Sequence, residues 1–246
     1  MIETTMNKKT RTILFFICVF LFALTAPSVI LYSQGYRFDF ETKKVVQTGG
    51  LYFKVAPRSA QVYINGKLKD TTSIFTNSSL IENLLPKTYY IEIKKDGYHS
   101  WQKTLEVNER QVTEAKNIIL IPQDVNFAKS IETPLPKYLT NATSSDGNKV
   151  VRYDEHEIWV SFPKEKKDIF LTRFSETIGN VFWLNDYYLI FNVGDKIKVA
   201  EIDDRDRLNV IDIAEFKAPE IFWDNNNGKL YVLSGSTLYL AEKLLP

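Results

Sequence analysis

The sequence has few of the residues on which catalytic and metal sites depend. Its 246 residues include one cysteine, Cys18, and two histidines, His99 and His156, which are far apart. Cys18 lies inside an apolar run, so a disulfide framework, a CxxC pair and a water-facing thiol nucleophile are not available. The net charge of +1 also lacks the basic excess of a nucleic-acid binder, so we expect no nucleic-acid partner.

Motifs that bind phosphate or calcium are missing as well. Gly49-Gly50 belongs to neither a GxGxxG nor a GxxxxGK pattern. The acidic run Glu201–Arg207 fails the ligand spacing of an EF-hand, so it is interpreted as a charged turn between two blades of the repeat region described below. Asp224–Gly228 is a second predicted turn, His156 lies in a predicted hairpin turn, and we place His99 on a sheet face. We therefore predict no catalytic, cofactor or metal site, and expect a protein that is not an enzyme.

The residues that are abundant favour a folded β protein. Apolar residues make up 44% and charged residues 25% of the chain, which is ordinary for globular proteins. Aromatic residues reach 13%, with 13 Tyr and 16 Phe, and β-branched residues are common. Both groups are enriched in strands, so we predict a mainly β fold behind an N-terminal apolar segment.

The apolar segment runs from Ile13 to Tyr32 without a charge. At 1.5 Å per helical residue it matches the hydrocarbon core of a bilayer, about 30 Å thick. Lys8, Lys9 and Arg11 precede it. By the positive-inside rule, residues 1–12 are cytoplasmic, residues 13–32 are a single transmembrane signal anchor, and the rest of the chain is exported.

A cleaved signal peptide is the alternative interpretation of this segment. Cleavage after Ala26 would leave Pro27 at the new N-terminus, which is a poor position for a protease. The apolar run also resumes at Val29. We therefore favour an uncleaved anchor, with the lipid bilayer as a partner and the bulk of the chain outside the cytoplasm.

Beyond a stalk at residues 33–48, residues 49–122 show short strand patterns separated by turns. Residues 51–57 alternate apolar and polar side chains, as do residues 61–67 and 88–98. Asn65-Gly66 suits the two positive φ angles of a type I′ hairpin turn. This region is predicted to be a small antiparallel β-sandwich.

The same region resembles the PEGA domain family. The resemblance covers Gly49 to Pro122. It departs from the family at Lys87-Thr88, where the family usually has a glycine after the proline that corresponds to Pro86. It implies a noncatalytic β-module associated with the cell envelope. The residues that carry it are Gly49-Gly50, Pro57, Ser59-Ala60, Val62–Lys67, Leu84-Leu85-Pro86, Tyr89, Gly97-Tyr98 and Trp101.

The C-terminal part contains an internal repeat. Residues 123–144, including Ser130–Thr140, are interpreted as a linker or an edge segment, and the repeats occupy residues 145–246. Phe182-Trp183 and Phe222-Trp223 are forty residues apart. Five further positions recur after forty-one residues: Leu189, Gly194, Ile197, Ala200 and Glu201 correspond to Leu230, Gly235, Leu238, Ala241 and Glu242.

A period near forty residues with several short strands is typical of a β-propeller blade. The pattern resembles TolB-like and WD-type propellers and implies about three blades, whereas closed propellers need about four or more. Four interpretations of this region remain open: an incomplete propeller, part of an oligomer, a truncated chain, or a different β-sheet fold that repeats.

Exposed aromatic side chains are the one binding surface that the sequence suggests. Tyr63, Tyr89, Tyr98 and Trp101 fall in the PEGA-like region and could form a platform on which a sugar ring stacks. In a β-domain this small, the same aromatic residues more often build the core.

These observations together predict a noncatalytic, membrane-anchored binding or scaffold protein of the bacterial cell envelope. Its expected partners are envelope proteins or cell-wall and surface polysaccharide, and a second copy of the chain is a further candidate partner. One alternative is an accessory subunit, or a truncated relative, of an envelope hydrolase or propeller enzyme. Another is an extracellular sensor that signals through a membrane partner.

Overall fold

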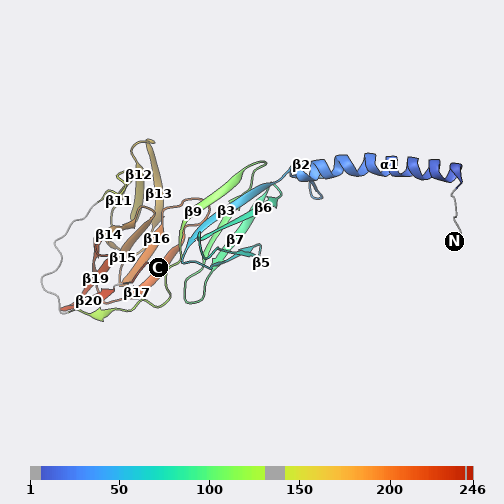
Figure 1. The fold of residues 1–246 in the computed structure, drawn as a ribbon. Coiled ribbons are helices and arrows are strands. Elements are labelled where there is room, and N and C mark those ends of the chain that lie inside the picture. The colour runs from blue at the N-terminus through green and yellow to red at the C-terminus, as the bar shows by residue number, and fades with distance from the viewer. Residues whose placement is uncertain (1–6, 131–141, 242, 246) are drawn as a thin grey trace, which may run out of the picture. The chain divides into compact units, whose positions relative to one another are not determined.

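The computed structural model describes residues 7–130, 142–241 and 243–245 (Figure 1). The predicted linker segment Ser130–Thr140 lies outside these residues except for Ser130, and so does Glu242 of the repeat. The fold is mainly β with one N-terminal helix, as predicted. The chain divides into two compact units. The first comprises Met1–Leu51, Ile81–Lys87 and Glu106–Thr113, and the second comprises Tyr52–Leu80, Thr88–Leu105 and Glu114–Pro246.

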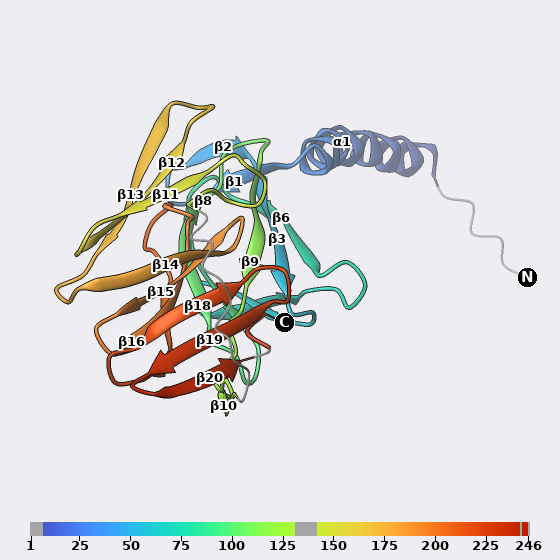
Figure 2. The same cartoon turned by 90° about the vertical axis from the view of Figure 1, so that its left-hand side faces the viewer.

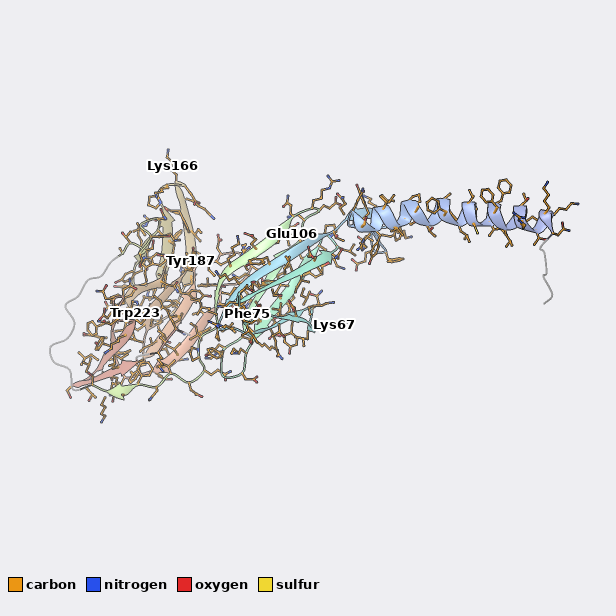
Figure 3. The ribbon with its side chains drawn as sticks, viewed as in Figure 1. Lys67, Phe75, Glu106, Lys166, Tyr187 and Trp223 are labelled. Carbon is orange, nitrogen blue, oxygen red and sulfur yellow. The ribbon has the colours of Figure 1, made fainter. Side chains whose placement is uncertain are left out.

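The helix of the first unit, α1, spans Lys8–Ser33 and contains the whole predicted apolar segment. The Asn7 side chain caps it by accepting a hydrogen bond from the Lys9 N–H. None of its residues is buried, and its side chains radiate outward in Figure 3. Its length and apolar composition are sufficient to cross a membrane.

After α1, the predicted stalk contains a hairpin of β1 (Tyr36–Asp39) and β2 (Lys44–Gln47). The Arg37 guanidinium lies 3.5 Å from the centroid of the Tyr32 ring, which connects the end of α1 to β1. Gly49-Gly50 then begins the next strand. A side chain at Gly49 would collide with the backbone carbonyl oxygens of Asn108 and Gln111, so this position requires glycine.

The predicted strands between residues 49 and 122 are present and form two sheets. Asn65 and Gly66 have φ angles of 49° and 75° and join two paired strands, which confirms the predicted hairpin turn. One sheet has the order β6-β3-β9 and the other β5-β4-β7-β8. The bounds are β3 (Gly49–Ala56), β4 (Gln61–Ile64), β5 (Lys67–Thr71), β6 (Ser78–Leu84), β7 (Thr88–Lys94), β8 (Trp101–Glu106) and β9 (Val112–Ile119).

The rest of the second unit contains three small antiparallel sheets in the described residues. They are called the first, middle and last sheet in chain order. The strands of the middle sheet are paired in sequence order. In the last sheet the earlier strand β10 pairs with β20, as can be followed in Figure 2. The first sheet consists of β11 (Val150–Tyr153), β12 (Glu157–Phe162) and β13 (Lys167–Arg173). The middle sheet consists of β14 (Ile178–Asn185), β15 (Tyr188–Val193), β16 (Lys196–Glu201) and β17 (Val210–Glu215). The last sheet consists of β10 (Ala128–Lys129), β18 (Glu220–Asp224), β19 (Lys229–Ser234) and β20 (Thr237–Ala241).

The sequence repeat coincides with a repeat of strand pairing. In the middle sheet, Trp183 pairs with Leu189, which in turn pairs with Ala200. In the last sheet the corresponding residues are paired in the same way: Trp223 with Leu230, and Leu230 with Ala241. Gly194 and Gly235 occupy the same turn in the two sheets, with φ angles of 55° and 59°.

The middle sheet is covered on both faces. Side chains such as Leu184 and Ile190 pack in one apolar cluster with Ile221 and Val232 of the last sheet. Alternate residues of the same strands pack in a second cluster with residues of the first sheet. Every residue of β15 is buried, which explains why all of them except Asn192 are apolar or aromatic.

Candidate functional site

The four predicted aromatic site residues do not form one exposed surface. Tyr89 on β7 and Trp101 on β8 are 7% and 3% exposed, so a ligand cannot stack on them. Tyr63 and Tyr98 are half-buried, and the ammonium of Lys94 lies 5.2 Å from the centroid of the Tyr63 ring. The predicted platform of four rings is therefore not formed. Tyr89 and Trp101 belong to the core, because alternate side chains of β7 and β8 point toward the buried face.

Trp101 leads instead to a buried ion pair that the sequence reasoning missed. Its Nε1 donates to Glu201 Oε2 at 2.8 Å, and Lys103 Nζ lies 2.8 Å from Glu201 Oε1. Lys103 is fully buried and Glu201 is 4% exposed. Asn209 Nδ2 donates to Glu201 Oε1 at 2.6 Å. We call Trp101, Lys103, Glu201 and Asn209 the Lys103 cluster.

Asp203 provides a second hydrogen-bond acceptor and a second negative charge near the Lys103 ammonium. Lys103 Nζ donates to the backbone carbonyl of Asp203 at 2.8 Å, and the Asp203 carboxylate lies 3.9 Å away. Burial alone would raise the pKa of Asp203, but a hydrogen bond from Arg205 and the charge of Lys103 outweigh it and lower that pKa. Such partners are needed because a buried charge without hydrogen bonds is very costly.

The residues that follow Glu201 cover the outer edge of β8, the edge that has no neighbouring strand. This strand lies at the end of its sheet. Asn209 accepts from the Gln102 N–H at 3.3 Å and donates to the Gln102 carbonyl at 3.0 Å. Asp206 accepts from the Thr104 N–H at 2.7 Å, and this bond lowers the pKa of its carboxyl group. Two side chains thus supply the hydrogen bonds that a neighbouring strand would otherwise make.

The edge of β9 receives similar but fewer contacts. This strand also ends its sheet. Arg205 donates to the Glu114 carbonyl at 3.0 Å, and the Tyr188 hydroxyl accepts from the Ile119 N–H at 2.9 Å. Burial and the Glu201 charge raise the pKa of Tyr188, which keeps this hydroxyl protonated. Between these two contacts, β9 borders a cavity.

This cavity has a volume of about 340 Å³. The ring of Tyr187, which is labelled in Figure 3, is 40% exposed at the turn between β14 and β15. Lys149 Nζ lies 5.0 Å from that ring centroid and also pairs with Asp146 at 2.6 Å. The cavity therefore offers an aromatic ring beside a rim of both charge signs, which suits a ligand with apolar and polar parts. Its other lining residues include Trp101, Lys116, Phe162, Glu201 and Arg205.

The structure confirms the predicted turns at Asp224–Gly228 and at His156, whereas Glu201–Arg207 lies inside the middle sheet and not between two blades. Glu201–Arg207 begins at the end of β16 and continues toward β17, and Asp224 accepts hydrogen bonds from the N–H groups of Asn226 and Asn227 between β18 and β19. His156 lies in the turn between β11 and β12. Across the described parts of the chain, no group of three His, Cys, Asp or Glu side chains could hold a metal ion.

One sequence signal could have identified the Lys103 cluster. In the strand after Gly97, Trp101 and Leu105 lie on the buried face, and Lys103 shares their phase. A lysine at a core position requires a buried acceptor. Its partner, Glu201, lies 98 residues later, and no local pattern links the two. Comparison of the chain with protein-family models and with curated proteins finds no match.

Proposed function

We propose that this chain is a noncatalytic, membrane-anchored binding or scaffold protein of the bacterial cell envelope. In this proposal α1 is an uncleaved single-pass anchor, with the basic residues Lys8, Lys9 and Arg11 on the cytoplasmic side. The β-sheets then lie outside the cytoplasm. The length, apolar composition and exposure of α1 support this arrangement.

The arrangement of strands supports the finer description of the fold. The three-stranded and four-stranded sheets suit a PEGA-like sandwich, whose two sheets would bury the alternating residues of β3 and β7. The repeated pairing around Trp183 and Trp223 suits propeller-like blades. The PEGA resemblance implies a module without an active site.

The observation that carries the proposal is the Lys103 cluster beside the cavity. A buried, hydrogen-bonded ion pair fixes the geometry of its surroundings, because displacing one partner leaves a buried charge without the other. It holds the residues after β16 against β8, and the cavity with Tyr187 lies at the same place. A rigid support beside a preformed cavity suits a binding protein, and we assign this cavity to a segment of an envelope protein or polysaccharide.

Sedimentation and crosslinking with the full-length chain test this function. The tagged chain, reconstituted in lipid nanodiscs, is incubated with purified peptidoglycan and surface polysaccharide, and separately crosslinked in intact envelopes. We expect saturable binding that Tyr187→Ala weakens. Lys166→Ala, at the turn between β12 and β13, is the matched control and should bind normally.

Two results would overturn the proposal. If Tyr187→Ala and Lys166→Ala bind equally well, the cavity is not the binding site. Saturable turnover of a peptide or glycan by the purified chain would contradict a noncatalytic function.

A further inference from the structure

The hairpin of β1 and β2, which follows α1 directly, carries an exposed apolar patch. Phe38 and Val45 are opposite each other in the pairing of the two strands, so their side chains lie on the same face. The ring of Phe40 meets the ring of Phe38 edge-on, with 5.1 Å between the centroids. Phe38 is 48%, Phe40 83% and Val45 61% exposed. We call these three side chains the hairpin patch. Their exposure requires an explanation, because burying them together would be favourable.

The base of the hairpin is held against the end of α1. The Thr48 N–H donates to the Gly35 carbonyl at 2.9 Å, which closes the hairpin just after the helix. The Arg37 guanidinium, which lies over the Tyr32 ring, also donates to the Tyr32 carbonyl at 2.7 Å. Strand β1 thus contacts α1, and Figure 1 labels β2 at that end of the helix. These contacts fix the hairpin beside the last turn of α1.

This position places the hairpin at the surface of a bilayer that α1 spans. Tyr32 is the last residue of the apolar run, and Phe38 follows six residues later. Arg37, the neighbour of Phe38 in β1, contacts Tyr32 itself. The headgroup layer adds roughly 5–8 Å on each side of the hydrocarbon core. With Ile13–Tyr32 in that core, the chain enters the headgroup layer where the hairpin begins.

The charges of the hairpin are compatible with this layer. Asp39 is 8% exposed, and its carboxylate accepts a hydrogen bond from the Glu41 N–H at 2.9 Å. The Glu41 carboxylate pairs with Lys87 at 3.1 Å. Lys43 and Lys44 are exposed between the turn and β2. Such long side chains extend their ammonium groups toward lipid phosphates. Both acids are therefore bonded within the protein, while two lysines flank the hairpin patch.

We propose that the hairpin patch lies in the interfacial region of the bilayer, so that the chain contacts the membrane through this hairpin as well as through α1. Aromatic and aliphatic side chains with neighbouring lysines are typical of segments that bind this region. The inference rests on the proposed role of α1 as a membrane anchor. Three side chains bind a bilayer weakly alone, but the anchor keeps them at a high effective concentration beside it.

A protein partner is less well matched to this surface. Stable protein interfaces bury about 800 Å² on each partner. The hairpin patch consists of three side chains, and the two strands that present it have four residues each. A bilayer needs no complementary shape, so a small patch at the end of α1 suffices.

The test places a fluorescent label beside the patch. Cys18 is the single cysteine, so Cys18→Ala with Glu41→Cys gives one labelling site next to Phe40 and leaves the hairpin patch intact. Losing the exposed pair of Glu41 with Lys87 costs little. The full-length chain is labelled with an environment-sensitive nitrobenzoxadiazole dye and reconstituted in vesicles of equal parts phosphatidylcholine and phosphatidylglycerol. The reference is the same labelled chain with Phe40→Ser and Val45→Ser in the same vesicles.

We expect the intact patch to give a blue-shifted emission relative to the reference, and strong quenching by lipids that carry a spin label near the headgroup. Both signals should be lost in the reference. Phe75→Ser is the matched control, because it removes an exposed Phe from the loop between β5 and β6, and it should change neither signal. Equal emission and quenching with and without Phe40 and Val45 overturn the proposal. A shift that grows with the ratio of protein to lipid reports contact between copies and overturns it as well.

Flotation of the vesicles after alkaline extraction tests α1 separately. A chain that floats without the shift and the quenching overturns the hairpin proposal alone. A chain that does not float overturns the anchor and the hairpin proposal together.

Discussion

The four-stranded sheet β5-β4-β7-β8 protects its two outer strands in opposite ways. The backbone of β8 is covered by Asp206 and Asn209, and its lysine, Lys103, is buried with Glu201. In contrast, β5 is exposed throughout and carries Lys67 and Lys69, and its pairing with β4 contains a register shift. Charges and irregular pairing discourage a further strand from adding to an edge. One edge is therefore closed by the chain itself, while the other stays free.

Breaking the ion pair on the closed edge should have the largest effect. Lys103→Met leaves the Glu201 carboxylate buried without its cation, and we expect the free energy of unfolding to fall by about 3–5 kcal/mol. Denaturant unfolding of the full-length chain in detergent, followed by tryptophan fluorescence, measures the loss. Lys69→Met on the open edge is the matched control and should change it by less than about 0.5 kcal/mol. Equal losses in the two variants would contradict the comparison.

Removing a side chain that caps the β8 backbone should have a smaller effect. Asn209→Ala leaves the Gln102 N–H and carbonyl without the partners they now have and removes one donor to Glu201. We expect a loss of about 1–3 kcal/mol in the same unfolding measurement. Asn226→Ala, in the exposed turn after β18, should have little effect. A wild-type stability for Asn209→Ala would show that β8 does not depend on this cap.

Acid should weaken the closed edge. The pKa values of Asp203 and Asp206 are lowered in the folded chain. Below the unfolded value of about 3.9, the unfolded chain binds protons that these folded carboxylates do not, so the free energy of unfolding falls as the pH drops. Asp206→Asn should make this pH dependence shallower, because its amide oxygen can still accept from Thr104 without titrating. An unchanged pH profile would contradict the assigned role of Asp206.

Removing charge from the open edge should change association more than stability. Lys67→Val with Lys69→Val makes β5 more apolar without disturbing a buried group. We expect a change of less than about 0.5 kcal/mol in stability, together with increased self-association in analytical ultracentrifugation. A double variant that stays monodisperse would indicate that the register shift alone protects this edge.

Local sequence patterns predicted the features that depend on neighbouring residues. Asn65-Gly66 forms its hairpin because both residues tolerate positive φ, and the recurring Phe-Trp pairs mark strands with the same pairing. The apolar helix followed from the length of an uncharged run. The partner of Trp101 could not be predicted in this way, because its Nε1 donates to Glu201, a hundred residues away. The cavity escaped prediction for the same reason, since its walls come from strands distant in sequence.

Hydrogen exchange along the sheet compares the two edges most directly. In one experiment on the full-length chain, the Gln102 and Thr104 amides of β8 should exchange slowly, since Asn209 and Asp206 accept their hydrogen bonds. The β5 amides that do not face β4 should exchange rapidly. Asn209→Ala should accelerate Gln102 and leave β5 unchanged. Equally fast exchange of β5 and β8 in the wild-type chain would contradict the conclusion that residues 201–209 close the edge of β8.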